Sequence, residues 1–153
     1  MDNTSDSSFM SNLPDPRTET EFYEDVVSKR FFAWLIDVVL ISIITAILTL
    51  LSLFTAVFIL PLVYATISFI YRWASLTRHS ATPGMRLVSL EMRQADGETF
   101  SGPTALVHTA GYFASVAVFP LQLVSVVLML MSERRQGLTD MVLGTVALNR
   151  ASR

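Results

Sequence analysis

Arg30 and Asp37 stand at the start of the longest apolar stretch of the chain, in the segment RFFAWLID. On a helix, a spacing of seven residues places them on nearly the same face, about 10 Å apart along the axis. The long side chain of Arg30 can reach water from within a membrane, but the short side chain of Asp37 cannot. An ionised Asp at the centre of a membrane helix costs about 2.5–3.5 kcal/mol. Asp37 must therefore face the protein interior, be protonated or have a partner.

The nearest candidate partner for Asp37 is Arg30, through direct contact or a bridging water molecule, and Arg72 is a second candidate. Asp140 lies outside the apolar stretches, where it could pair with Arg30 or Arg86. Two interpretations stay open. In one, Asp37 binds a proton or a cation, as a carboxylate of a proton-coupled transporter does. In the other, Arg30, Asp37 and Asp140 form a structural clasp that ties the C-terminal segment to the first helices.

We favour the clasp because a complete transport path is hard to build from two or three short helices. A monomer of 153 residues also lacks the inverted repeats that are common in carriers. An oligomer could supply the missing walls, so an oligomeric transporter of ions or small solutes is the alternative. The preferred interpretation is a structural or accessory membrane component that acts through partners.

Other residue types that carry chemistry are sparse in this chain. It has no cysteine, which excludes a disulfide framework, a thiolate metal site and a cysteine nucleophile. Neither His79 nor His108 has a second histidine or a carboxylate at metal-ligand spacing, so we predict no metal site and no cofactor. His108 is more typical of a hydrogen-bonded packing residue than of a ligand. We find no Ser–His–Asp order typical of a catalytic site and expect no enzymatic activity.

The elements that position these residues are dominated by apolar stretches without charge. Of the chain, 52% is apolar, and no Asp, Glu, Lys or Arg occurs from 38 to 71, a run of 34 residues. One helix over the apolar stretch 31–75 would be roughly 67 Å long, whereas the hydrocarbon core of a membrane is about 30 Å thick. The chain must therefore cross twice, as a helical hairpin with spans near 31–52 and 55–75. Pro61 is expected to kink the second span.

The distribution of basic residues predicts how this hairpin is oriented. Lys29 and Arg30 precede the first span, and the apex of the hairpin carries no charge. The arginines that follow the second span are Arg72, Arg78, Arg86 and Arg93. Short loops rich in Lys and Arg stay on the cytoplasmic side of a membrane. We therefore expect a protein of the cytoplasmic (inner) membrane with both ends of the hairpin, and the N-terminus, in the cytoplasm.

A second charge-free stretch runs from 100 to 132 and contains Pro120 near its middle. It predicts a third apolar region, about 104–132, that is bent at the proline. This region is either one tilted span or two short helices that dip in and return, and the basic residues on both sides favour the return. The cytoplasmic loop 76–103 has strand-like alternation, and the tail GLTDMVLGTVALNR is either a strand against it or a surface segment.

The two ends of the chain differ from its middle in composition. Seven of the thirteen acidic residues lie in the first 25. This predicts a disordered acidic tail over 1–28, followed by a membrane domain over 29–149 and a short C-terminal end over 150–153. The acidic N-terminus is unlike a signal peptide, so the first helix is expected to remain uncleaved. Nucleic acid is not an expected partner, because no basic stripe with interleaved aromatic residues occurs.

The order of these motifs resembles that of the RDD family of small membrane proteins. Arg30 opens the first membrane helix, and Asp37 follows within AWLID. The loop ATPGMRLVSLEMRQADGE comes next, and ERRQGLTDMVLGTVAL, with Asp140, lies near the C-terminus. These three residues match the one Arg and two Asp for which the family is named. The resemblance covers about residues 26–149.

The resemblance extends to the loop, where the family motif often reads G-x-T-x-G-K-R. The matching residues are Thr82, Gly84 and Arg86 in the loop, and Gly144 and Thr145 after the second Asp. The sequence departs from the motif at Ser80, where a Gly is common, and at Met85, where a Lys is common. Members of the family have been proposed to transport solutes or ions, including by sodium–proton exchange. The resemblance therefore implies that transport is the alternative function.

Taken together, the sequence predicts an all-α integral membrane protein with a transmembrane hairpin, a third Pro-bent region and a short loop that can contain strands. Its expected partners are the lipid bilayer and either further copies of the chain or a larger membrane complex. Arg30, Asp37 and Asp140 are the primary candidate residues. The second-tier candidates are Arg72, His108, Gly144 and Thr145.

Overall fold

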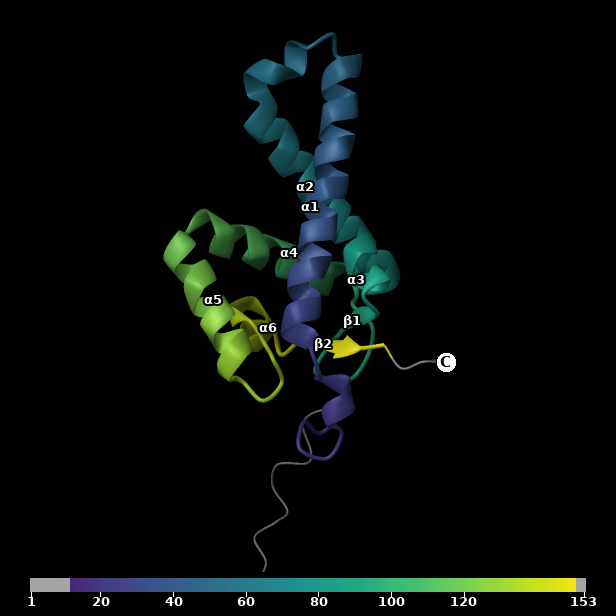
Figure 1. Cartoon of the computed structure of the whole chain (residues 1–153), viewed down its shortest axis with the longest axis vertical. Coiled ribbons are helices and arrows are strands. Elements are labelled where there is room, and N and C mark those ends of the chain that lie inside the picture. Colours follow the sequence, from purple (N-terminus) through teal and green to yellow (C-terminus); the bar gives the residue numbers. More distant parts are fainter. Residues whose placement is uncertain (1–11, 151–153) are drawn as a thin grey trace, which may run out of the picture.

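The computed structural model describes residues 12–150, which are mostly helical (Figure 1). The long helices are α1 (Val26–Leu51), α2 (Leu60–His79), α4 (Gly102–Ala117) and α5 (Phe119–Met131). The short elements are the 3-10 helices η1 (Thr20–Phe22) and η2 (Thr55–Ile59), the helices α3 (Pro83–Leu87) and α6 (Leu138–Leu143), and the strands β1 (Leu90–Arg93) and β2 (Val146–Asn149).

The predicted hairpin consists of α1 and α2, joined at a tip over residues 52–59 that includes η2. Both helices are long and apolar enough to cross a membrane, which confirms the prediction of two such helices. The tip contains no glycine, and it turns at Leu53 and Phe54, whose φ angles are 53° and 64°. In Figure 1 the two helices run close together near the base of the hairpin and separate toward the tip.

The predicted kink at Pro61 is wrong. Pro61 lies in the first turn of α2 and not in the interior of the helix. A proline is tolerated in the first turn because its missing N–H would have no partner inside the helix, and its fixed φ angle already suits a helix. The helix therefore begins just before this residue, at Leu60, and η2 occupies the segment that the sequence assigned to the start of the second span.

The third apolar region forms two helices, α4 and α5, whose axes are bent by 115°. Pro120 lies in the first turn of α5, just after the bend. Across the bend, the hydroxyl of Ser115 donates to Oε1 of Gln122 at 3.1 Å. The pair lies beside the lower part of α1 and does not reach the tip of the hairpin (Figure 1).

A small core joins the ends of the helices to the two strands. Strands β1 and β2 are antiparallel, with Leu90 opposite Asn149 and Arg93 opposite Val146. The buried core residues are Val26, Leu76, Leu90, Met92, Phe100, Ala105 and Ala147. Within the described residues the C-terminal segment is thus a strand against the loop after α2, and β2 lies at the base of the hairpin.

The segment just before α1 differs from the prediction of a disordered tail over 1–28. Leu13 and Tyr23 are buried against Val146 and Leu148 of β2. The hydroxyl of Tyr23 donates to the backbone oxygen of Pro14 at 2.8 Å. The composition of the tail is polar, but β2 offers an apolar surface that these few apolar side chains cover. The rest of the predicted tail, residues 1–11, and the end 151–153 lie outside the described residues.

Candidate functional site

Asp37 lies within α1 and is only 1% exposed. Its Oδ1 accepts hydrogen bonds from the hydroxyl of Tyr71 at 2.7 Å and from the backbone N–H of Gly84 at 2.8 Å. Its Oδ2 accepts a hydrogen bond from the hydroxyl of Thr82 at 2.5 Å. Tyr71 belongs to α2, and the other two donors belong to the start of α3. This carboxylate therefore joins three helices.

The sequence of α3 explains why two of these donors point at one carboxylate. Thr82 is the N-cap of α3, and its hydroxyl oxygen accepts from the backbone N–H of Met85 at 3.2 Å while its proton goes to Asp37. Pro83 starts the helix, where a proline is favoured. The free N–H groups of a helix N-terminus attract a negative charge. Asp37 thus completes the cap of α3 from a different helix.

Gly84 permits the close approach of α3 to α1. A Cβ atom at this position would collide with the backbone oxygen of Ala33 and would lie 2.7 Å from Oδ1 of Asp37. We expect Gly84→Ala to lower the free energy of unfolding by about 1–3 kcal/mol, because α3 must move away from Asp37. The measurement is reversible unfolding in mixed micelles titrated with sodium dodecyl sulfate.

Gly102→Ala is the matched control for this substitution. A Cβ atom there would meet only Cγ2 of Thr77, at 3.7 Å, which is an ordinary contact. The control is expected to leave stability unchanged or to raise it by up to about 1 kcal/mol. Equal effects of the two substitutions would show that the tight contact at Gly84 is not needed.

Asp140 forms the second buried carboxylate site, and it is also 1% exposed. Its Oδ2 lies 2.7 Å from Nη1 of Arg30 and accepts from the backbone N–H of Gly137 at 3.0 Å. Its Oδ1 accepts from Nε2 of His108 at 2.8 Å and from the hydroxyl of Thr145 at 3.2 Å. These donors come from α1, from the start of α6, from α4 and from the residue before β2. Asp140 therefore ties the C-terminal segment to the base of α1 and to α4.

The surroundings of Asp140 keep it ionised at neutral pH. Burial raises the pKa of Asp140, but the charge of Arg30 and the hydrogen bond from His108 lower it by more. The net effect holds the pKa of Asp140 well below its ordinary value of 3.8. The site is thus a buried ion pair between Arg30 and Asp140, with His108 as an additional donor.

Of the candidate pairings of Arg30, the structure has the one with Asp140 and not the one with Asp37. Arg30 and Asp37 share a helix face but are two turns apart, about 10 Å along the axis. Asp140 occupies the position beside Arg30, and neutral donors surround Asp37. Arg72 is not a partner of Asp37 either, since its guanidinium lies 4.3 Å from the ring centre of Tyr112 and makes no ion pair within residues 12–150.

Of the remaining candidate residues, Gly144 and Thr145 belong to the site of Asp140, whereas Arg86 lies elsewhere. Gly144 has a φ angle of 66° and ends α6, which allows Thr145 to turn toward Asp140. Arg86 is exposed and lies at neither carboxylate. Sequence reasoning missed Tyr71 and Gly137 as donors. Tyr71 ends the charge-free run, so its position fits an aromatic residue at the membrane boundary as well as it fits a hydrogen-bond donor. The donor of Gly137 is a backbone N–H, which no pattern of side chains reveals.

Within residues 12–150, no group of three His, Cys, Asp or Glu side chains is arranged to hold a metal ion. The two sites therefore combine carboxylates with fixed donors from the protein itself. Both depend on α1, which carries Arg30 and Asp37 two turns apart.

The sequence pattern of the RDD family matches residues 26–144. The chain belongs to the RDD family. The match begins at the first residue of α1 and ends at Gly144, so it contains Arg30, Asp37 and Asp140 together with the loop that carries Thr82 and Gly84. The family and the two long apolar helices indicate a membrane protein. Comparisons of this RDD protein with curated proteins and with solved structures gave no match.

Proposed function

We propose that this RDD protein is an accessory component of the cytoplasmic membrane that acts through partner proteins. In this proposal, Asp37 and Asp140 hold its helices, loop and C-terminal segment together and do not carry ions. The observation that supports this most strongly is the set of donors around the carboxylates. Asp37 accepts three hydrogen bonds, and Asp140 accepts from three donors beside its ion pair with Arg30.

A carboxylate that binds a passing cation needs free acceptor positions and a path to water. An ionised carboxylate offers about four lone-pair positions. Three donors occupy most of these positions at each carboxylate, Arg30 forms an ion pair with Asp140, and both side chains are 1% exposed. A cation would therefore find at most one free acceptor position at either carboxylate, and at Asp140 it would also meet the charge of Arg30. This arrangement is typical of a structural site.

The exposed surface supports a membrane location and contacts with other proteins. Large apolar side chains are exposed along the hairpin and along α5, among them Leu53, Phe58 and Met131. In a membrane, lipid or a neighbouring protein covers such a surface. We propose further copies of the chain or a larger membrane complex as the partner. Because α4 and α5 stay beside the lower part of α1, we also propose that they form a re-entrant pair on the cytoplasmic side.

The test of this function combines flux with purification. The purified protein in proteoliposomes is expected to conduct neither protons nor sodium above the rate of empty liposomes. The protein extracted from its native membrane in a mild detergent is expected to remain bound to a larger complex. Proton or sodium flux that is present in the wild type and absent in a folded Asp37→Asn variant would contradict the proposal and establish the transport alternative.

A further inference from the structure

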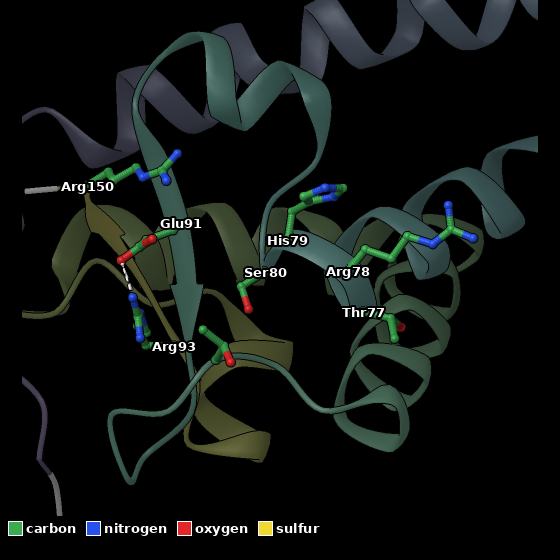
Figure 2. Close-up of a pocket in the computed structure, with 8 residues that line it drawn as sticks. Thr77, Arg78, His79, Ser80, Glu91, Arg93 and Arg150 are labelled. Carbon is green, nitrogen blue, oxygen red and sulfur yellow. Dashed lines mark hydrogen bonds and ion pairs between the residues drawn. The ribbon is translucent and has the colours of Figure 1, made fainter. Parts of the chain in front are cut away.

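A pocket with a volume of about 340 Å³ lies at the C-terminal end of α2 (Figure 2). A smaller cavity of about 170 Å³ adjoins it, and His79, Glu91 and Arg150 line both. The other residues of the larger pocket are Thr77, Arg78, Ser80, Arg93 and Thr99. A pocket at the lower end of the size range for ligand sites suits a small polar group. It lies apart from both carboxylate sites.

The pocket has an excess of positive charge. Glu91 pairs with Arg93 at 2.6 Å, so these two charges offset one another. Arg150 borders both cavities, and Arg86 borders the smaller one. No carboxylate of residues 12–150 lies within ion-pair distance of either guanidinium. In Figure 2 the side chain of Arg150 crosses β1, and Arg78 extends away from His79. Two unpaired arginines therefore remain available to an anion.

The position of the pocket at one end of α2 indicates which kind of anion it can bind. Helix α2 has 20 residues and is therefore roughly 30 Å long, which equals the thickness of the hydrocarbon core. His79 is the last residue of α2 and Ser80 its C-cap. A span that begins at Leu60 would place the pocket at the level where a membrane changes from acyl chains to phosphate groups. Trp73, an exposed residue one to two turns earlier, is typical of this boundary.

We propose that the two adjoining cavities together bind a phosphate ester through Arg150, which borders both, and Arg86, which borders the smaller one. The ring of His79, which also lines both cavities, and the hydroxyl of Ser80 in the larger one are further hydrogen-bonding groups. Guanidinium groups bind phosphate oxygens with two parallel hydrogen bonds. The headgroup of an anionic phospholipid and a soluble phosphate ester share this chemistry. The inference goes beyond the accessory function, because it assigns a ligand to residues that neither carboxylate site uses.

The experiment is native mass spectrometry of the full chain released from detergent micelles, with added phosphatidylglycerol, phosphatidylcholine or glycerol 1-phosphate. One arginine near an anionic membrane surface contributes about 1 kcal/mol, which corresponds to about fivefold in affinity. The double variant Arg86→Gln with Arg150→Gln is therefore expected to bind phosphatidylglycerol about 25-fold more weakly than the wild type.

The matched control is the double variant Arg17→Gln with Arg135→Gln, which removes the same charge away from the pocket. It is expected to bind as the wild type does. Binding of phosphatidylglycerol but not of glycerol 1-phosphate would assign the pocket to lipid, and binding of both, with the same dependence on Arg86 and Arg150, would assign it to soluble phosphate esters as well. The proposal is overturned if both double variants bind equally, or if phosphatidylcholine binds as tightly as phosphatidylglycerol.

Discussion

Replacement of Asp37 by alanine is expected to lower the free energy of unfolding by about 3–5 kcal/mol. The substitution removes the acceptor for Tyr71, Thr82 and the backbone N–H of Gly84 at once. The two hydroxyl groups can rotate toward other acceptors, but the N–H group cannot. Since the site is buried, water does not replace the lost acceptor without opening the contact between α1 and α3. Reversible unfolding in mixed micelles measures this loss.

Asp37→Asn provides the matched comparison, with an expected loss of only about 1–2 kcal/mol. The amide oxygen of Asn can accept from Tyr71 and Gly84, as Oδ1 of Asp37 does. Its NH₂ group then faces Thr82, whose hydroxyl oxygen can accept a hydrogen bond if its own proton rotates away. Equal and large losses for both variants would indicate that the negative charge, not the set of acceptors, holds the site together.

The ion pair between Arg30 and Asp140 has the second large expected effect. Asp140→Ala leaves the guanidinium of Arg30, whose side chain is 18% exposed, without its counter-charge. We expect a loss of about 3–5 kcal/mol, because an uncompensated buried charge is costly. The surface pair of Arg17 with Glu133 is the control, since its side chains are 77% and 63% exposed. Glu133→Ala is expected to cost no more than about 1 kcal/mol.

The ion pair of Asp140 with Arg30 makes the stability of the protein depend on pH. Because the pKa of Asp140 is lowered in the folded protein, its contribution to stability is present above its ordinary pKa of 3.8. That contribution is lost as the pH falls below about 4 and the unfolded chain takes up a proton first. Wild-type stability should therefore fall more steeply below this pH than that of Asp140→Asn. Parallel curves for the two proteins would contradict the ion pair.

The sequence predicted the helices better than the partners of its charged residues. Long runs without charge mark α1, α2 and the bent pair, because membrane lengths and the cost of buried charge leave few alternatives. Asp140 was a candidate partner for Arg30, and the structure has this pair. The partners of Asp37 were not predictable, because Tyr71 and Thr82 are neutral and the third donor is a backbone N–H that no residue type reveals.

Two further differences have local physical causes. Pro61 was expected to kink a helix, but a proline is most easily accommodated in a first turn, and the boundary of α2 is set there. The polar composition before α1 predicted disorder, yet Leu13 and Tyr23 are buried on β2. The composition of a segment is an average. It does not reveal that two of its apolar side chains pack against a strand that lies more than 100 residues later in the sequence.

The most direct test of the structural role of Asp37 is the exchange rate of the Gly84 amide proton, measured by NMR in lipid nanodiscs. This proton is donated to Oδ1 of Asp37. In the wild type and in Asp37→Asn it should exchange slowly, and in Asp37→Ala it should exchange at least about 100-fold faster, as expected for the loss of about 3 kcal/mol of protection. An unchanged slow rate in Asp37→Ala would show that the carboxylate does not hold α3 against α1 and would contradict the structural role of Asp37.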